Sequence, residues 1–507
     1  MYYLRSRKNK IPLHKNEGIG IIYYMEPKAH LPPIVKDLHI YFVGIKGTGM
    51  SALAELMLHN GAVVSGSDTR EKFYTDAVLQ ELSIPYSEGF RKKNIPEEVD
   101  FVLYSAAYEP ESHVELLEAK GRGIPLIEYT QALGDLSRGT HAVGVSGVHG
   151  KTTTTALIGT LIKELDLPGS VLVGSAVKSF HNRATYYNGD RFFVAETCEY
   201  RRHFLDFYPD QLIITTIDED HLDYYRDYRD IEAAFREYAM KLPPGGSLIY
   251  CADDPGAAGL ARMVSAERTD LQFVPYGMEA EGPFRITESE MSEGKQRMRL
   301  AGIDSDIFLR IPGHHTLLNA AGAVAAICGL YRFLDREVSP EFFSKAAKAL
   351  ESFQGSKRRS ELIGEARGII FIDDYGHHPK EIQTTLSGFR QFYPDRRIII
   401  DFMSHTYTRT AAFLDQFAVS FGDADVVVLH KIYASARETK AGIDGNTLFE
   451  KVKENHPNVR YYHEVDEALP FLRDILKSGD LFITMGAGEN WRLSERLYNE
   501  CRGEEDD

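Results

Sequence analysis

The stretch IYFVGIKGTGMSALAELM, residues 40–57, predicts a buried strand, a glycine-rich turn and a helix in direct succession. Within it, residues 47–52 fit the pattern G-x-G-x-x-A, and Gly44 precedes them by three residues. The next predicted strand, VVSGSD, ends in Asp68, nineteen residues after Gly49. This arrangement typically holds a pyrophosphate at the helix N-terminus and a ribose hydroxyl on the acidic side chain. The pattern does not distinguish NAD from another nucleotide diphosphate.

A second glycine-rich turn lies in VGVSGVHGKTTTTALIGTLI, residues 143–162, again between a predicted strand and a helix. Lys151 supplies a mobile cation for the β- and γ-phosphates, and the Thr152 hydroxyl can bind Mg²⁺. The match to the general phosphate-loop pattern is incomplete, because its first glycine falls at Val145. The turn predicts an ATP site formed by Gly147, Val148, His149, Gly150, Lys151, Thr152 and Thr153.

Such a site needs an acidic residue at the end of a nearby strand to hold the metal. Glu196 ends the predicted strand FFVAE, and His221 follows the strand LIITTID among acidic neighbours at positions 218–220. Taken singly, Glu196 is equally well explained as an ordinary strand-end carboxylate, and a lone histidine such as His221 is more often structural. Their joint position after neighbouring strands makes them candidate metal ligands.

Short apolar strands alternate with helical stretches through most of the chain, which predicts α/β architecture with parallel sheets. We expect a flexible extension over residues 1–36, with Met25 as an alternative start, and three consecutive α/β domains after it. These are a Rossmann-like domain at 37–138, a central P-loop ATPase-like domain at 139–352 and a C-terminal Rossmann-like domain at 353–507. The polar stretch FQGSKRRSE predicts a hinge between the last two.

Composition narrows the class of protein. The chain has 507 residues, of which 43% are hydrophobic and 26% charged, with a formal net charge of −16. This charge argues against a nucleic-acid partner. The four cysteines form no CxxC pair, which fits a reducing cytosol and neither a disulfide framework nor a thiolate zinc site. No run suggests a membrane-spanning helix, and the basic N-terminal segment lacks the apolar core of a secretory signal.

Several separate motifs, spread over residues 39–489, resemble the Mur ligases of peptidoglycan synthesis. Besides the two glycine-rich turns, they are AETCEYRRHF, TTIDEDHLDYY, PGHHTLLNAAGA, DDYGHHPKEI, SHTYTRT and MGAGENW. The resemblance implies a cytoplasmic, monomeric or homodimeric enzyme whose three domains hold a UDP-sugar, ATP and an amino acid. Its reaction would join L-alanine to the lactyl carboxylate of UDP-N-acetylmuramate through an acyl phosphate, with Mg²⁺ or Mn²⁺ as the metal.

The resemblance also implies roles for individual residues. Catalytic roles fall to Lys151, Glu196, His221, Arg358 and His378, and metal binding to Thr152, Glu196 and His221. His315, Asn319, Arg358 and Asp374 join the ATP site, and His377, His378, His405 and Arg409 form the amino-acid site, where an arginine can clamp a carboxylate. The UDP-sugar site comprises Gly44, Gly47, Thr48, Gly49, Met50, Ser51, Asp68, Ser105 and Ala106.

Four positions depart from the family pattern. Thr216 and Thr316 stand where the family has asparagine, Met403-Ser404 replaces Gln-Pro, and Glu489 replaces aspartate. These changes affect the details of nucleotide and amino-acid contacts more than the class of reaction. We expect the loss of two asparagines to alter adenine binding.

Four other interpretations compete with this one. A recycling ligase attaches a whole tripeptide to the same sugar nucleotide, but its segment DEYDTAFFD differs from CEYRRHFLD here. Folylpolyglutamate synthases share the ATP module but lack the first glycine-rich unit. An NAD-dependent oxidoreductase would leave GVHGKTTTT without a task, and a non-catalytic nucleotide-binding protein would not need the retained polar residues.

Overall fold

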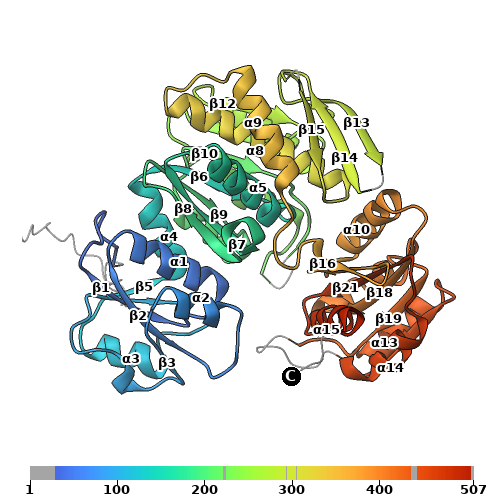
Figure 1. The fold of residues 1–507 in the computed structure, drawn as a ribbon. Helices are drawn as coiled ribbons and strands as arrows, with labels where there is room; N and C mark the ends of the chain where they lie inside the picture. Colours follow the sequence, from blue (N-terminus) through green and yellow to red (C-terminus); the bar gives the residue numbers. More distant parts are fainter. Residues whose placement is uncertain (1–28, 221–223, 293, 304, 435–441, 504–507) are drawn as a thin grey trace, which may run out of the picture.

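The computed structural model describes residues 29–220, 224–292, 294–303, 305–434 and 442–503. They form three α/β units arranged in an arc, with the middle unit between the other two (Figure 1). The α/β class and the parallel sheets predicted from the sequence are confirmed. His221 lies outside the described residues.

The first unit is a five-stranded parallel sheet in the order β3-β2-β1-β4-β5. The order reverses at β1, so the turn after β1 lies at the switch point where such sheets bind ligands. Its elements are β1 His39–Val43, α1 Thr48–His59, β2 Val63–Asp68, α2 Thr75–Glu81, β3 Tyr86–Glu88, η1 Lys92–Asn94, β4 Phe101–Tyr104, α3 Val114–Gly121, β5 Leu126–Glu128 and α4 Tyr129–Arg138.

The middle unit has a seven-stranded sheet in the order β12-β11-β10-β6-β9-β7-β8, parallel except for β8. The central strand β6 leads into the second glycine-rich turn. The elements are β6 His141–Ser146, α5 Lys151–Glu164, β7 Gly169–Val177, η2 Lys178–Phe180, β8 Arg183–Tyr187, β9 Phe192–Glu196, η3 Tyr200–Asp206, β10 Gln211–Ile214, α6 Tyr228–Ala239, β11 Ser247–Cys251, α7 Pro255–Glu267, β12 Gln272–Tyr276, α8 His314–Phe333 and α9 Pro340–Ser352.

A small antiparallel sheet, which the sequence analysis did not anticipate, is inserted between β12 and α8. Its strands are β13 Ile286–Ser292, β14 Lys295–Leu300 and β15 Asp306–Leu309. The alternation of exposed and buried residues along β14 is the pattern of a sheet that buries one face. Figure 1 shows this sheet on the side of the middle unit that faces α10.

The C-terminal unit has a six-stranded sheet in the order β16-β17-β21-β18-β19-β20, with only β16 antiparallel. Its elements are β16 Glu361–Ala366, β17 Ile369–Asp374, α10 Pro379–Phe392, β18 Arg397–Met403, α11 Tyr407–Ala412, α12 Leu414–Ala418, β19 Val426–Leu429, α13 Gly445–Lys453, β20 Val459–Tyr461, η4 Val465–Ala468, α14 Leu469–Ile475, β21 Asp480–Gly486 and α15 Trp491–Arg502. The segment between α9 and β16 has no helix and links this unit to the middle one.

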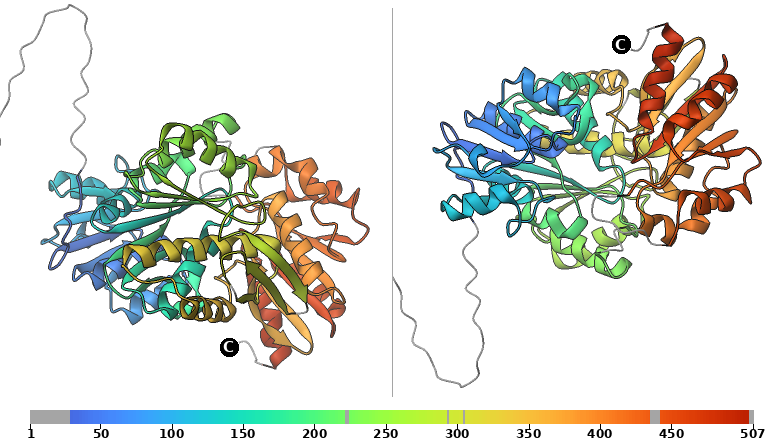
Figure 2. Two further views of the ribbon diagram at one scale, coloured as in Figure 1. Left: turned by 90° about the horizontal axis from the view of Figure 1, so that it is seen from above. Right: turned by 90° about the horizontal axis from the view of Figure 1, so that it is seen from below.

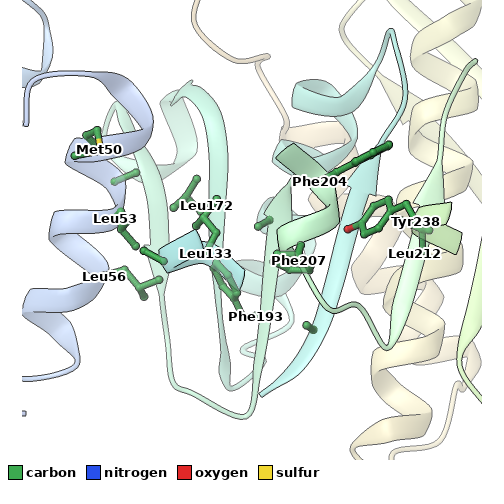
Figure 3. Close-up of a cluster of buried hydrophobic side chains, with 14 of the residues drawn as sticks. Met50, Leu53, Leu56, Leu133, Leu172, Phe193, Phe204, Phe207, Leu212 and Tyr238 are labelled. Atoms are coloured by element: carbon green, nitrogen blue, oxygen red, sulfur yellow. The ribbon is translucent and has the colours of Figure 1, made fainter. Parts of the chain in front are cut away.

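One hydrophobic core joins the first two units. Figure 3 shows Met50, Leu53 and Leu56 of α1 turned toward Leu172 of β7. All four side chains are at most 3% exposed. Two views at right angles to Figure 1 show the first unit packed against the middle unit, with the C-terminal unit on the other side (Figure 2). Burial of this apolar face holds the two glycine-rich turns in one rigid frame.

Among the described residues, α8 is the one helix long and apolar enough to cross a membrane. Of its most apolar 18-residue window, 72% is buried inside the protein, against α5 and the middle sheet. Its apolar length is therefore accounted for as the core helix of the middle unit.

Candidate active site

The second glycine-rich turn has the backbone of a phosphate loop. Gly147 and Gly150 have φ values of 138° and 85°, which favour glycine. A Cβ on Gly147 would lie 2.1 Å from Thr215 Oγ1, and one on Gly150 would lie 2.7 Å from Asn319 Oδ1. Side chains are therefore excluded where the backbone N–H groups curve around the start of α5.

Lys151, the first residue of α5, keeps its charge at this turn. Its Nζ lies 2.9 Å from Glu199 Oε2 and also donates to the carbonyls of Gly147 and Val148. Burial alone would lower the pKa of Lys151, but the neighbouring carboxylates of Glu199 and Glu196 raise it above its usual value. The ammonium is positioned to meet a phosphate.

A small cavity of about 50 Å³ adjoins this lysine, and its size fits a phosphate group rather than a whole nucleotide. It is lined by Val148, His149, Gly150, Lys151, Thr152, Thr153, Glu196, Arg359 and Glu381. The middle unit therefore supplies one wall and the C-terminal unit the other.

Thr152 and Glu196 form an oxygen pair at this cavity. The Thr152 hydroxyl lies 3.1 and 3.0 Å from the two Glu196 carboxylate oxygens, and Gly174 N–H donates to Oε2 at 2.9 Å. Hydroxyl and carboxylate oxygens are the donors that Mg²⁺ prefers, so the pair fits that ion. No group of three or more metal-ligating histidine, cysteine or acidic side chains occurs within the described ranges.

A larger cavity of about 350 Å³ opens beside the turn, a volume typical of a small-molecule site. Its walls come from the middle and C-terminal units and the linker between them, and include His149, Gly150, Thr153, Thr216, Asp254, Tyr276, His315, Thr316, Asn319, Phe353, Ser356, Arg359, Asp374 and Glu381. Three buried atoms on these walls, His315 Nδ1, Asn319 Nδ2 and Ser356 Oγ, have no hydrogen-bond partner among the described residues. Burial lowers the pKa of His315 to about 4, so its ring is neutral. The cavity thus offers uncommitted polar groups beside the phosphate loop, as an adenine nucleotide requires.

The two threonines that replace asparagine both lie on this cavity. Thr216 Oγ1 accepts a hydrogen bond of 2.9 Å from the backbone N–H of His149 and so supports the phosphate loop. Thr316 Oγ1 instead donates to Pro312 O at 2.9 Å, within its own helix end. The first threonine supports the loop, whereas the hydroxyl proton of the second is already donated to Pro312.

Of the two linker arginines, Arg359 and not Arg358 lies at the ATP cavity. Arg358, expected at the ATP phosphates, turns into the C-terminal unit, where its Nε lies 3.1 Å from Asp373 Oδ2 and its Nη2 donates to Gly486 O. Burial still raises the pKa of Asp373 to about 6. The adjacent Arg359 lines both cavities. The backbone at Arg358 has a φ of 58° and turns the chain there, so that the two adjacent side chains point to different sites.

Glu381 of α10 is a central residue of the site that was not predicted from the sequence. Its carboxylate accepts from the backbone N–H groups of His377 and His378 at 2.9 and 3.2 Å. Its other oxygen lies 3.0 Å from His149 Nδ1 in the phosphate loop. Burial would raise the pKa of Glu381, but the hydrogen bond with His149 and the nearby Arg359 guanidinium hold it well below its usual value. This carboxylate ties the C-terminal unit to the phosphate loop.

The predicted C-terminal residues gather at the ends of β17 and β18. Asp374 accepts from Ser360 N–H at 2.6 Å and from Gly376 N–H at 2.7 Å, so it shapes the cavity wall. Burial lowers the pKa of His377 to about 4 and lowers that of His378, whose Nε2 is buried and has no hydrogen-bond partner in the described part of the chain. Because His378 Nδ1 accepts from Lys380 N–H at 3.4 Å, Nε2 carries the proton of the neutral ring and can donate it to a ligand.

His405 and Arg409 lie beside this pair, as predicted from adjacent strand ends. The His405 ring is 5.6 Å from that of His377, and Arg409 Nη1 is 3.4 Å from His405 Nδ1. Arg409 Nη2 also lies 3.2 Å from Asp220 of the middle unit, an acidic partner that the motif did not reveal. The guanidinium that we expected to clamp a carboxylate therefore holds one from the protein itself.

The first glycine-rich turn is built differently. Gly44 has a φ of 86°, and a Cβ there would lie 2.7 Å from the Tyr108 ring; one on Gly49 would lie 2.6 Å from Tyr129 OH. Asp68, expected at a ribose, uses both oxygens on backbone, accepting from Lys46 N–H at 2.6 Å and Thr69 N–H at 2.7 Å. In this structure Asp68 therefore stabilises the closed conformation of the turn.

The remaining residues predicted for this site surround the turn. Gly47 precedes α1, and Thr48 Oγ1 accepts from Tyr74 OH at 3.2 Å. Ser51 Oγ donates to Thr48 O at 3.0 Å, whereas the side chain of Met50 is buried in the core. Ser105 N–H donates to Val43 O at 3.1 Å, which places Ser105 and Ala106 at the end of β4 beside the turn.

Comparison with known protein families shows the family to which the chain belongs. Residues 39–141 match the Mur ligase family catalytic domain, residues 145–327 the Mur ligase middle domain, and residues 358–488 the Mur ligase glutamate ligase domain. The chain therefore belongs to the Mur ligase family.

Individual relatives within this family carry the name of one particular ligase. The UDP-N-acetylmuramate–L-alanine ligase of Treponema pallidum is 50% identical over 93% of this chain and 98% of its own. That of Desulfitobacterium hafniense is 40% identical over 91% and 99%. Among solved structures, UDP-N-acetylmuramate-alanine ligase MurC of Thermotoga maritima has a TM-score of 0.73 at 25% identity, covering 92% of this chain and 99% of its own. The murein peptide ligase mpl of Psychrobacter arcticus, with a TM-score of 0.63 at 21% identity over 93% and 100%, shares the fold.

Proposed function

We propose that the chain is an ATP-dependent ligase that joins L-alanine to the lactyl carboxylate of UDP-N-acetylmuramate, forming a peptidoglycan precursor, ADP and phosphate. The observation that carries this function is the meeting of Lys151, Glu196 and Arg359 at one phosphate-sized cavity, next to the histidines of the C-terminal unit. Relatives up to 50% identical bear the name of this activity. The expected class of enzyme and the recognition of the family are confirmed.

The first step activates a poor electrophile. The lactyl carboxylate attacks the γ-phosphorus of ATP, the bond to the β-phosphate oxygen breaks, and ADP leaves with the electron pair. Lys151 and Arg359, from opposite walls, offset the charge on the transferring group. When bound at Thr152 and Glu196, Mg²⁺ would neutralise phosphate charge, and Mn²⁺ is the alternative ion.

The second step forms the amide. The amine of L-alanine attacks the acyl phosphate carbon, and the tetrahedral intermediate expels phosphate. The expelled phosphate takes up the amine proton, and His378, whose Nδ1 accepts from Lys380 N–H, can donate its Nε2 proton to the reacting groups. Arg409 would bind the alanine carboxylate in exchange for Asp220.

The remaining expectations form part of the same proposal. The UDP-sugar occupies the turn after β1, and the adenine lies beside His315 and Asn319. The proposed domains span residues 37–138, 139–352 and 353–507. The first boundary then lies between α4 and β6, and the second lies just after α9. We further propose a cytoplasmic enzyme acting as a monomer or homodimer on small molecules, without a nucleic-acid or membrane partner.

Phosphate release tests this function. Purified protein is supplied with Mg²⁺, ATP and UDP-N-acetylmuramate, with and without L-alanine. We expect release that depends on alanine, together with a product heavier by one alanyl residue in the mass spectrum. Release only with the tripeptide L-Ala-γ-D-Glu-meso-diaminopimelate would assign the recycling reaction instead. Absence of release with either would contradict a ligase.

A further inference from the structure

Three consecutive cations of the linker contact three different parts of the molecule. Arg358 binds Asp373 in the C-terminal unit, and Arg359 faces the ATP cavity. Lys357 does neither. Its Nζ lies 5.6 Å from the ring centroid of Tyr74 in the first unit and 5.5 Å from that of Trp491 in the C-terminal unit. A cation at this distance from an aromatic face is attracted to it.

The backbone of Lys357 is fixed to the middle unit. Its N–H donates to Ala176 O at 2.7 Å, and Ser175 Oγ donates to its carbonyl at 2.7 Å. Ser356 also forms an isolated bridge with Val177 of β7. Lys357 therefore contacts all three units. Its backbone binds the middle unit, and its ammonium lies near rings of the first and C-terminal units.

Tyr74 and Trp491, the two rings near Lys357 Nζ, each lie next to an element of a predicted site. Tyr74 OH donates to Thr48 Oγ1 at 3.2 Å, at the start of α1 in the first glycine-rich turn. Trp491 opens α15 directly after the segment whose Gly486 O accepts from Arg358. No carboxylate lies within ion-pair distance of Lys357 Nζ in the part of the chain that the structure describes, and Glu495 of α15 acts on it only from farther away.

We propose that Lys357 is a positioning residue that couples the UDP-sugar site to docking of the C-terminal unit. This inference rests on the proposed function, which puts the UDP-sugar at the first turn. ATP, bound between the middle and C-terminal units, favours the docked arrangement with Trp491 over the ammonium. Docking then fixes the ammonium over Tyr74, and Tyr74 fixes Thr48. Because coupling is reciprocal, ATP and the UDP-sugar favour each other's binding.

Calorimetry with UDP as the probe measures this coupling. UDP is titrated into the full-length protein alone and in the presence of saturating Mg²⁺ and a non-hydrolysable ATP analogue. We expect the analogue to lower the Kd of UDP by about fivefold in the native protein. Lys357→Met should give the same Kd in both conditions. Lys357→Arg should restore the effect, because a guanidinium also stacks on aromatic rings.

Lys178→Met is the matched control. Lys178 Nζ donates to Leu362 O at 2.6 Å and so links the middle and C-terminal units, and among the described residues no hydrogen bond or ion pair joins it to the first. The fivefold effect should persist in this variant. If Lys178→Met abolishes it equally, or if Lys357→Met retains it, the inference is overturned.

The single tryptophan of the chain provides a second readout. UDP should change the fluorescence emission of Trp491 in the native protein and in Lys357→Arg, but not in Lys357→Met. An equal change in Lys357→Met, or none in a native protein that binds UDP, would overturn the coupling alone. Failure of the native protein to bind UDP would instead contradict the proposed function, and the inference with it.

Discussion

The two glycine-rich turns look alike in sequence but use their lysines in opposite ways. In the first turn, the side chain of Lys46 is fully buried, and its Nζ lies 3.0 Å from Asp76 and 3.2 Å from Glu88. In the second, Lys151 reaches the phosphate-sized cavity. A turn that only holds a nucleotide can rely on backbone N–H groups, whereas a turn that takes part in phosphoryl transfer needs a cation at the reacting group.

The largest effect that this contrast predicts is on turnover. Lys151→Ala should lower kcat by about a thousandfold or more, because the transferring phosphoryl group loses a cation. The protein should remain folded, as judged by circular dichroism and a cooperative thermal transition. Residual turnover above a tenth of the native value would contradict the proposed role of Lys151.

The corresponding change in the first turn should act on stability. Lys46→Met leaves the Asp76 carboxylate largely buried without its cation, which costs about 3–5 kcal/mol of the free energy of unfolding. Urea denaturation measures this loss, and Lys46→Arg serves as the control that keeps the charge. At a temperature where the variant is folded, kcat should change by less than about threefold. A thousandfold loss of kcat with unchanged stability would erase the distinction between the two turns.

A smaller effect should show that the two turns bind different nucleotides, because a change in the first turn should alter the KM of only one of them. Gly49→Ala places a Cβ 2.6 Å from Tyr129 OH, so the first turn must shift. We expect the KM for UDP-N-acetylmuramate to rise about tenfold, as for a loss of about 1.4 kcal/mol of binding, with the KM for ATP unchanged.

The matched control for that experiment is Gly121→Ala at the end of α3 in the same unit. Nothing lies within 4 Å of the Cβ that it adds. Steady-state kinetics of Gly121→Ala should match the native protein. A rise in the KM for ATP in Gly49→Ala would show that the first turn does not serve a separate nucleotide.

The smallest expected effect concerns the departure from the family pattern at the ATP cavity. Thr316→Asn restores the amide, and we expect it to change the KM for ATP by a few-fold, as one added hydrogen bond would. Thr316→Val, which removes the bond to Pro312, controls for helix stability. An unchanged KM for ATP in Thr316→Asn would refute the idea that this threonine alters adenine binding.

The sequence predicted well those features that depend on local pattern. Both turns lie between a strand and a helix, and the family and its reaction class followed from motifs in order. Lys151, Thr152 and Glu196 line one cavity, because α5 begins and β9 ends at the same edge of one sheet.

The features that the sequence could not predict arise from contacts between distant segments. Glu381 in α10 appears as an ordinary residue of a helix first turn, yet it bridges to His149 more than 200 positions earlier in the chain. Whether Arg358 or Arg359 faces ATP depends on the φ of 58° at Arg358, which no pattern in FQGSKRRSE reveals. The Asp220–Arg409 pair likewise exists only because two units meet.

The central claim is that one turn binds a nucleotide that is consumed and the other a nucleotide that is carried through intact. Labelling both oxygens of the lactyl carboxylate of UDP-N-acetylmuramate with ¹⁸O tests it most directly. Mass spectrometry should find one ¹⁸O in the released phosphate, one in the new amide, and an intact UDP group on the product. Unlabelled phosphate, with ¹⁸O in AMP or a cleaved UDP group, would contradict the account.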